Sequence, residues 1–323
     1  MRRLGVGVGI ITAVVAAVFV VRLVGTHAVY SADDRHDLFA TADGNRAVVA
    51  DTPNDGSNAS GPSELWSVSA SGAKTDLGVI AIANCHDVVV NSMHSLSTGH
   101  LGVTAFCLED DDGPTYYLTV DLPSLHAATV TRLASEISDV AGPIGTGAWA
   151  TRYHFEPDCT WIEQVTSDGS ASLPATWPSG SPNVPVPAKD CAGQWQTDDL
   201  AITADGRKLY FAAAHYTSAA AADTNQGWGI YCFDETTDTV TTIASGFEYM
   251  RGIDVNRDTS ALVISAQRDY DAGLWLVDTA NGRVRMMADD PLLVSPSFTS
   301  DGSTVVTFNS HDVKMIKVPS RSG

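Results

Sequence analysis

The stretch ITADGRKLYFAA, from Ile202 to Ala213, decides the fold of this 323-residue chain. Two apolar runs flank an Asp-Gly pair and two cationic residues. Asp-Gly between such runs predicts a β-hairpin, because tight hairpin turns need positive φ angles that glycine adopts without steric strain. A hairpin of this kind that recurs at a regular interval would define the architecture of the whole chain.

Similar turn signals recur along the sequence, 43 to 59 residues apart. They lie at Asp43-Gly44, Thr98-Gly99, Thr146-Gly147, Asp205-Gly206, Asp258 and Asp301-Gly302. Apolar runs such as RAVVA, KLYFAAA and TVVTF follow these turns, and their β-branched and aromatic residues favour strands. The chain therefore contains six copies of one unit.

A second landmark gives the same number of copies. After each hairpin comes a further strand, and these strands align on Val68, Val120, Val165, Phe233, Val277 and Val318. Short runs such as TVTTIAS and RVRMMA then supply a fourth strand. A four-stranded sheet with two apolar faces is buried when such sheets stack radially, so we predict an all-β, six-bladed β-propeller. The sixth copy ends before its fourth strand, and we expect His27 to Ala32 to fill that place and close the ring.

Two motifs within this pattern resemble a known repeat. SPSFTSDGSTV, from Ser295 to Val305, and LWLVD, from Leu274 to Asp278, are similar to the WD40-like propeller repeat of the TolB family. The resemblance extends over about residues 27 to 323, although blades 2 and 3 lack the Asp-Gly turn. It implies a six-bladed propeller, a fold that serves many unrelated activities.

The first 26 residues differ from the rest. Arg2 and Arg3 precede an uncharged run from Leu4 to Val21, whose length is at the lower limit for a membrane-spanning helix. Positive charge before the run favours a cytoplasmic N-terminus and a body outside the cytoplasm. Two interpretations remain open: an uncleaved single-pass anchor helix, or a signal peptide whose cleavage leaves a secreted protein. In both, residues 1–26 form the targeting segment and residues 27–323 form the propeller.

The formal net charge is -19, and the charges of the first 26 residues are all positive, so the propeller itself is strongly acidic. Such a surface repels nucleic acid and anionic lipid headgroups, and we expect no nucleic-acid partner. A cationic ligand, or a basic protein of the envelope or the extracellular space, is a better electrostatic match. Acidity alone also keeps an exported protein soluble, here as a monomer.

Five cysteines in an exported chain predict two disulfides and one free thiol. Cys85 precedes the second turn and Cys107 follows it, at positions that antiparallel pairing brings to one edge of the sheet. We therefore predict a Cys85–Cys107 disulfide. Cys159 and Cys191 both fall at predicted loop ends of blade 3 and form the second predicted pair. Cys232 lies in a central strand, where a buried free thiol is expected.

In this strand order, the loops between blades and the loops between second and third strands open on one face. Aligning the first strands places His36, Asp37, Asp87, Asp139, Asp198, Asp199 and Arg251 toward the central mouth of that face. We predict that His36, Asp37, Asp198, Asp199 and Arg251 bind a partner or ligand. The within-blade loops add further carboxylates, including Glu109 to Asp112, Asp158 and Asp223.

Clustered carboxylates are the ligands that calcium prefers, so a structural calcium could bind here. No segment has the spacing of a calcium loop, and no His-Glu-x-x-His or Gly-x-Ser-x-Gly motif is present, so we predict neither a cofactor nor a catalytic residue.

The function that we predict is therefore a non-catalytic, membrane-tethered propeller that binds a protein or ligand outside the cytoplasm through an acidic face. One alternative is an enzyme at the channel mouth, such as a metal-dependent lactonase or another hydrolase. A second alternative is a carbohydrate or peptide binder that uses Trp149, Trp177, Trp195 or Trp228, although tryptophans in propellers more often pack between blades.

Overall fold

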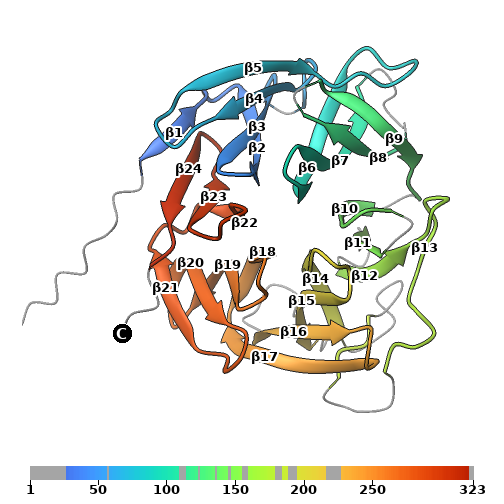
Figure 1. Ribbon diagram of the computed structural model, residues 1–323, viewed down its shortest axis with the longest axis vertical. Helices are drawn as coiled ribbons and strands as arrows, with labels where there is room; N and C mark the ends of the chain where they lie inside the picture. The colour runs from blue at the N-terminus through green and yellow to red at the C-terminus, as the bar shows by residue number, and fades with distance from the viewer. Residues whose placement is uncertain are drawn as a thin grey trace, which may run out of the picture.

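The computed structural model describes residues 27–319, except 57, 109–113, 123, 135–136, 145–146, 155–158, 179–183, 188–194 and 216–226. The regular elements in this part of the chain are all β-strands. They form six four-stranded antiparallel sheets arranged radially around a central axis (Figure 1). The predicted all-β, six-bladed propeller is therefore confirmed.

The predicted anchor helix lies in residues 1–26, outside the described residues. Within the part that is described, no helix has the length and apolar character needed to cross a membrane.

In blades 1 to 5 the four strands follow one another in the chain, and the first lies nearest the axis. Blades 1 to 3 are β2 (His36–Asp43), β3 (Arg46–Pro53), β4 (Glu64–Val68) and β5 (Lys74–Val79); β6 (Val88–Ser97), β7 (His100–Cys107), β8 (Tyr116–Asp121) and β9 (His126–Arg132); and β10 (Ile137–Ala141), β11 (Ala148–His154), β12 (Cys159–Val165) and β13 (Ala171–Ser172). Blades 4 and 5 are β14 (Trp195–Ile202), β15 (Lys208–His215), β16 (Trp228–Asp234) and β17 (Thr239–Phe247); and β18 (Tyr249–Val255), β19 (Ala261–Arg268), β20 (Asp271–Asp278) and β21 (Val284–Ala288). The residues used above to align the third strands lie in β4, β8, β12, β16 and β20, and Val318 directly follows the sixth third strand, β24.

Blade 6 closes the ring with a strand from the start of the propeller. It contains β22 (Val294–Phe298), β23 (Thr304–Phe308) and β24 (Asp312–Lys317), and β1 (Ala28–Ser31) pairs with β24 as its outermost strand. Figure 1 shows β1, in blue, beside β24, in red. The buried Tyr30 of β1 also donates its hydroxyl to Asp51 of β3, at 2.5 Å. The predicted closure by the segment at His27 to Ala32 is confirmed.

The second strand of each blade is an almost uninterrupted apolar run, because both of its faces are covered by neighbouring blades. In β3, for example, Val48, Val49 and Ala50 are all fully buried although they alternate between faces. Separate hydrophobic clusters fill the interfaces between adjacent blades. Burial of each Leu or Ile side chain in them contributes about 1.5–3 kcal/mol, so the ring is held mainly by blade-to-blade packing.

The stretch that decided the fold forms the turn between β14 and β15. Gly206 has a φ of 72°, and its amide donates to the carbonyl of Thr203 at 2.8 Å. Asp205 accepts hydrogen bonds from the Thr203 hydroxyl at 2.6 Å and the Arg207 amide at 3.2 Å. These donors favour the charged carboxylate and lower the pKa of Asp205. Asp-Gly is therefore required both for the backbone conformation and for its local hydrogen bonds.

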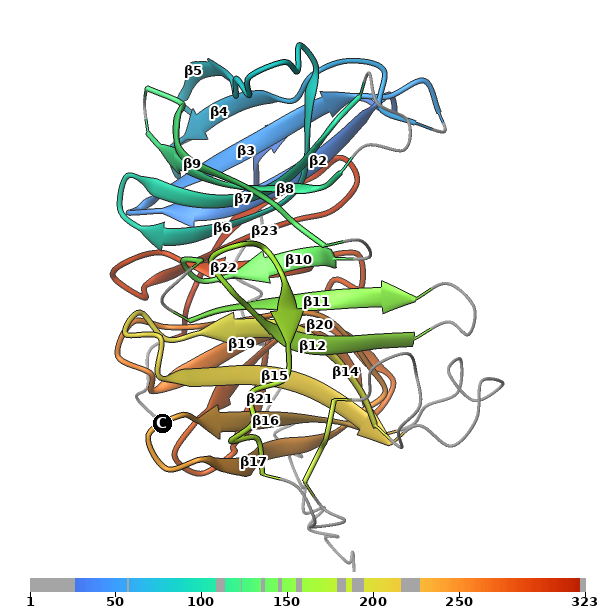
Figure 2. The same cartoon turned by 90° about the vertical axis from the view of Figure 1, so that its right-hand side faces the viewer.

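Turns between first and second strands all lie on one side of the ring, which we call the turn face. The connections between blades, and between second and third strands, lie on the opposite side, the loop face. Figure 2 shows the ring from the side, with strands running between these two faces.

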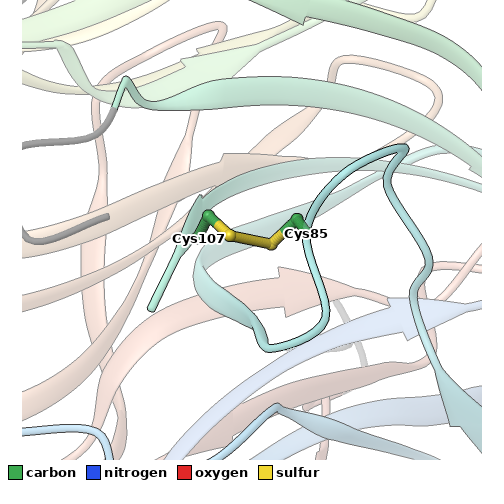
Figure 3. The surroundings of a disulfide bond; sticks show 2 residues. All are labelled: Cys85 and Cys107. Carbon is green, nitrogen blue, oxygen red and sulfur yellow. A yellow bond between two sulfur atoms is a disulfide. The ribbon is translucent and has the colours of Figure 1, made fainter. Parts of the chain in front are cut away.

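A disulfide joins Cys85, which precedes β6, to Cys107 at the end of β7, as predicted (Figure 3). Cys159 is also disulfide-bonded. Its predicted partner, Cys191, lies outside the described residues, so this pairing stays a prediction. Cys232 is a buried free thiol, as predicted.

Candidate functional site

The principal cavity of the described structure has a volume of about 730 Å³ and lies on the propeller axis. Its wall is formed by the innermost strands of all six blades, by the turns that follow them, and by Phe308 of β23. Lining residues near the turn face include Gly44, Thr98, Thr203, Arg257 and Ser300. The cavity therefore extends from the middle of the innermost strands toward the turn face.

The inner wall is shaped by β-bulges. The pairing of first and second strands shifts register in five of the six blades, at Asn91, Ser138, Asp199, Arg251-Gly252 and Ser295-Pro296. A bulge inserts a residue and changes the direction of the side chains around it. Asp199 and Ser295 have φ angles of 40° and 43°, a backbone conformation rarely adopted by residues other than glycine. Each bulged segment contributes to the cavity wall.

Three carboxylates from successive blades line the cavity: Asp139, Asp199 and Asp254. Asp139 accepts hydrogen bonds from the Ser92 hydroxyl at 2.5 Å and from the Val140 amide at 2.8 Å. Asp254 accepts the amide of Phe298, in the next blade, at 2.6 Å.

Asp199 is positioned by its own neighbour. Its amide donates to the Asp198 carboxylate at 2.9 Å, and its carboxylate accepts a hydrogen bond from the Gly252 amide of blade 5. In the part of the chain that the structure describes, none of the carboxylates of Asp139, Asp199 and Asp254 forms an ion pair.

Burial without a cation changes the acidity of these groups. Desolvation raises the pKa of Asp254 to about 7. Desolvation also raises the pKa of both Asp198 and Asp199, and repulsion from the Asp198 carboxylate raises that of Asp199 further. A buried carboxylate is costly to ionise when no positive charge is near it. A cation that enters the cavity would therefore favour the ionised forms of these carboxyl groups and would be attracted to them.

A histidine faces the same cavity from blade 2. His94 lines the wall beside Asp139, and its ring stacks on Tyr117 at a centroid distance of 5.9 Å. The amide of Gly142 donates to His94 Nε2 at 3.1 Å. Desolvation lowers the pKa of His94, so the imidazole is neutral at pH 7.

A second cavity, of about 460 Å³, lies toward the loop face between blades 1, 2 and 6. Asp37 lines it, together with apolar side chains such as Leu38, Val89 and Leu292. Phe39, Asn91 and Phe308 line both cavities, and the rings of Phe39 and Phe308 meet edge to face at 5.9 Å. These three shared residues lie at the boundary between the two cavities.

The predicted binding residues are thus distributed over several environments. Asp199 lines the principal cavity, and Asp198 lies directly behind it. His36 instead bonds through Nδ1 to Asp51, at 2.5 Å, and so joins the network that holds β1. Arg251 is exposed, with its guanidinium 5.0 Å from the centre of the Tyr249 ring. A binding role for His36, Asp37 and Arg251 stays a prediction.

The two faces differ in charge. On the loop face the described acidic residues are Asp33, Asp34, Asp37, Asp55, Glu64, Asp87, Glu248, Asp269, Asp271, Asp289, Asp290 and Asp312, against Arg35, Arg132, Arg251, Arg268 and Lys314. Lys314 is bound to Asp290 at 2.8 Å. The turn face is more evenly charged, because Arg46, Lys74, Arg207, Lys208, Arg257, Arg283 and Lys317 lie there beside acidic residues such as Asp43, Asp121, Asp205, Asp258 and Asp301. The acidic tip from Glu109 to Asp112, Asp158 and Asp223 lie outside the described residues.

The tryptophans named for the carbohydrate alternative are largely part of the core. Trp149 and Trp177 are buried between blades 3 and 4, where they contact Phe233. Trp195 packs edge to face against His215, and Trp228 is half-buried. Trp149 and Trp177 therefore present no ring face to a ligand.

No group of three or more His, Cys, Asp or Glu side chains that could hold a metal ion comes together in the described ranges. A structural calcium ion, and a metal-dependent enzyme at the channel mouth, stay predictions.

Sequence reasoning missed His94 and Asp254. Both lie on first strands, but neither stands at the strand start, which is where loop-face residues were sought. Asp254 is four residues before the Asp258 turn signal, and His94 is four before Thr98. Counting back from the turn, instead of forward from the loop, would have found them.

No family model and no curated protein matches this sequence. The structure is similar to that of a gluconolactonase from Xanthomonas campestris, with a TM-score of 0.53, 14% identity, and coverage of 90% of this chain and 89% of that one. It is also similar to a luciferin-regenerating enzyme, with a TM-score of 0.51, 12% identity and coverage of 91% and 96%. TolB from Acinetobacter baumannii aligns with a TM-score of 0.47 and 12% identity, over 91% of this chain and 66% of that one. At these identities the similarity shows the propeller fold alone.

Proposed function

We propose that this protein is a binding propeller that takes a small organic cation into its axial cavity. The observation that carries the proposal is the set of Asp139, Asp199 and Asp254, three cavity-lining carboxylates from successive blades without an ion-pair partner in the described structure. An ammonium or guanidinium group bound among them would stabilise the ionised forms of Asp199 and Asp254, which burial disfavours. Arg257, the one cationic side chain of the described lining, lies at the exposed rim and leaves the interior acidic.

The shape of the site also supports a small ligand. A volume of about 730 Å³ lies in the range of small-molecule sites, and mixed walls with a few fixed polar groups are typical of them. The bulges hold these groups on strands and not on loops, so little order has to be gained on binding. We further propose, from the sequence, that the propeller works outside the cytoplasm and is attached there by residues 1–26.

Calorimetric titration with three simple compounds tests the proposal. Aminobutanol carries an ammonium group at one end of a short chain and a hydroxyl at the other. Pentylamine has a methyl group in place of the hydroxyl, and butanediol has a second hydroxyl in place of the ammonium. We expect both amines to bind and butanediol not to bind.

Asp199→Asn should weaken amine binding about 10- to 100-fold, since a hydrogen bond to a charged group contributes about 1.5–3 kcal/mol. Asparagine tolerates the positive φ at this position, so the fold should be kept. Asp238→Asn is the matched control, because Asp238 is an exposed turn residue with a φ of 50°. Equal amine affinity for the parent and Asp199→Asn would overturn the proposal.

An enzyme at the same site remains the main alternative to a binding protein. It predicts turnover of a small substrate, which the double change Asp198→Asn with Asp199→Asn would abolish at every salt concentration. Binding through charge predicts instead that amine affinity falls as salt rises, because ions screen the attraction. A compound that is bound and chemically changed would replace the binding function by a catalytic one.

A second candidate function is supported by the acidic loop face, whose described residues include few cations. A basic partner protein would be attracted to this face, and its association rate would fall steeply with salt. Exchanging Asp269 and Asp271 for asparagine should slow that association and leave amine binding in the cavity unchanged. Surface-binding kinetics with a lysine-rich peptide would measure the first effect.

A further inference from the structure

We infer that His94 is a neutral hydrogen-bond donor that presents Nδ1–H to the axial cavity and selects cations that also carry a hydroxyl or carbonyl oxygen. This inference deepens the proposed function and rests on it. It stands on the hydrogen bonds and packing around the imidazole ring.

The first step is the tautomer of His94. The backbone amide of Gly142 donates to Nε2 at 3.1 Å, and an amide nitrogen has no lone pair to accept a hydrogen bond in return. Nε2 must therefore carry the lone pair. In a neutral imidazole the proton then belongs to Nδ1.

The second step is the fixed position of the ring. Tyr117 stacks on His94, and its hydroxyl donates to the carbonyl of Gly142 at 2.8 Å while lying 3.2 Å from His94 Nε2. Tyr117, His94 and Gly142 thus form a closed arrangement that joins blades 2 and 3. A Cβ atom at position 102 would overlap both the Tyr117 hydroxyl and His94 Nε2, so Gly102 is required for this packing.

The third step concerns the nitrogen of His94 that no described protein group occupies, which is Nδ1. Every described hydrogen bond of the His94 ring is made by Nε2. Nδ1 is not one of the fully buried nitrogen or oxygen atoms that lack a hydrogen-bond partner, so it is accessible to solvent. Since His94 lines the cavity, Nδ1–H is available there as a donor. A ligand atom that meets it must be an acceptor.

The fourth step places this donor relative to the carboxylates. Ser92, two residues before His94 on β6, donates its hydroxyl to Asp139 of the next blade at 2.5 Å, and His94, Asp139 and Asp199 line the cavity from the successive blades 2, 3 and 4. A cation held by Asp139 or Asp199 therefore has its remaining atoms near His94. An amine with a nearby oxygen fits both requirements, and amino alcohols, amino sugars and amino amides belong to this class.

Nitrogen NMR of the full-length chain, labelled with ¹⁵N in its histidines, tests the tautomer directly. The His94 signals are assigned by their loss in His94→Gln. We expect a protonated-type shift at Nδ1 and a lone-pair-type shift at Nε2 at pH 7. A proton on Nε2 would overturn the inference even if amines bind.

Titration with the compounds introduced above tests selectivity. Aminobutanol and pentylamine differ in a hydroxyl and a methyl group of similar size, so their affinity ratio reports the acceptor. We expect aminobutanol to bind about three- to tenfold more tightly, the effect of one neutral hydrogen bond.

Two variants at His94 distinguish its nitrogens. The side-chain amide nitrogen of asparagine, like Nδ1, is bonded to Cγ, whereas that of glutamine lies one bond further out, like Nε2. His94→Asn should therefore keep the preference for aminobutanol, and His94→Gln should reduce the ratio to about one. Far-ultraviolet circular dichroism confirms that each variant is folded.

The outcomes separate this inference from the proposed function. Equal affinities for both amines in the parent protein would overturn the role of His94 and leave the cation site standing. Absence of any amine binding would overturn both. A preference for aminobutanol that His94→Gln leaves intact would assign the acceptor contact to another residue.

Discussion

Asp254 offers a quantitative test of how strongly the cavity disfavours negative charge. Its pKa rises from an ordinary value of 3.8 to about 7, chiefly because the carboxyl is removed from water. We consider the change Asp254→Asn, which replaces the carboxyl by a neutral group of the same shape. The amide oxygen can still accept the hydrogen bond from the Phe298 amide.

The sign follows from comparing the folded and unfolded chains. Below about pH 4, Asp254 is protonated in both states and imposes no penalty on folding. Between about pH 4 and 7 the unfolded chain loses this proton while the folded chain retains it, so the stability of the parent falls as pH rises. Above about pH 7 the penalty is constant. The asparagine variant has no such titration.

The magnitude is set by the shift of about three pKa units. At about 1.4 kcal/mol per unit, the penalty reaches at most about 4 kcal/mol above pH 7. Asp254 lines a cavity that admits water, so we expect about half of this, roughly 2 kcal/mol. If asparagine makes a weaker hydrogen bond than the aspartic acid it replaces, the stability of the variant falls by about 1 kcal/mol at every pH.

Urea unfolding of the parent and Asp254→Asn at about pH 3.5, 5, 6.5 and 8 would measure the effect. The stability of the variant should gain on that of the parent by about 2 kcal/mol between pH 3.5 and pH 8, with most of the gain below pH 6. Asp238→Asn, on an exposed turn, should run parallel to the parent over this range. Parallel curves for Asp254→Asn would show that the carboxyl is well solvated and that the acidic cavity is electrostatically unremarkable.

Three further predictions concern the ring and its cysteines. Tyr30→Ala should destabilise the protein by about 3 kcal/mol in urea, because it removes a buried ring that ties β1 to blade 1, whereas Tyr270→Ala, at a position 88% exposed, should change stability by less than about 0.5 kcal/mol. Replacing Cys85 and Cys107 together by serine should lower the free energy of unfolding by about 3 kcal/mol, since their bond closes a loop with a sequence separation of 22; an unchanged urea midpoint would contradict this. Cys232, whose pKa burial raises to about 11, should resist a thiol reagent at pH 8 in the native protein and react once the chain is unfolded; rapid reaction of the native protein would mean that the strand is accessible.

The fold was predictable because its determinants are local and repeated. An Asp-Gly turn such as Asp205-Gly206 specifies its own backbone conformation, and the apolar runs beside it specify strands buried on both faces. Six copies leave few architectures that bury such sheets. The closing strand was predictable from the number of strands in each copy. The sixth copy lacked one strand, and the segment containing Tyr30 belonged to no other copy. The Cys85–Cys107 pair followed in turn from the hairpin register.

The site was predictable only in part, because its geometry depends on departures from regular pairing. In a regular strand, side chains alternate between two faces, so counting by two would assign the inward positions. A bulge interrupts that count, and the bulges near Asn91, Ser138 and Asp199 are not marked by glycine or proline. Sequence alignment of strand starts placed Asp199 at the loop-face mouth, whereas the structure places it in the middle of β14, where it lines the axial cavity.

The missing companions are set by contacts between blades, which no local pattern records. Asp254 is identified by the amide of Phe298, a residue 44 positions later in the next blade. His94 is identified by the amide of Gly142, 48 positions later and also in the next blade. Each of these bonds exists because radial packing places successive innermost strands side by side. In the sequence, the residues that line the cavity look like ordinary polar residues of a strand. Their hydrogen bonds to the next blade and their position around one cavity form only when the ring is closed.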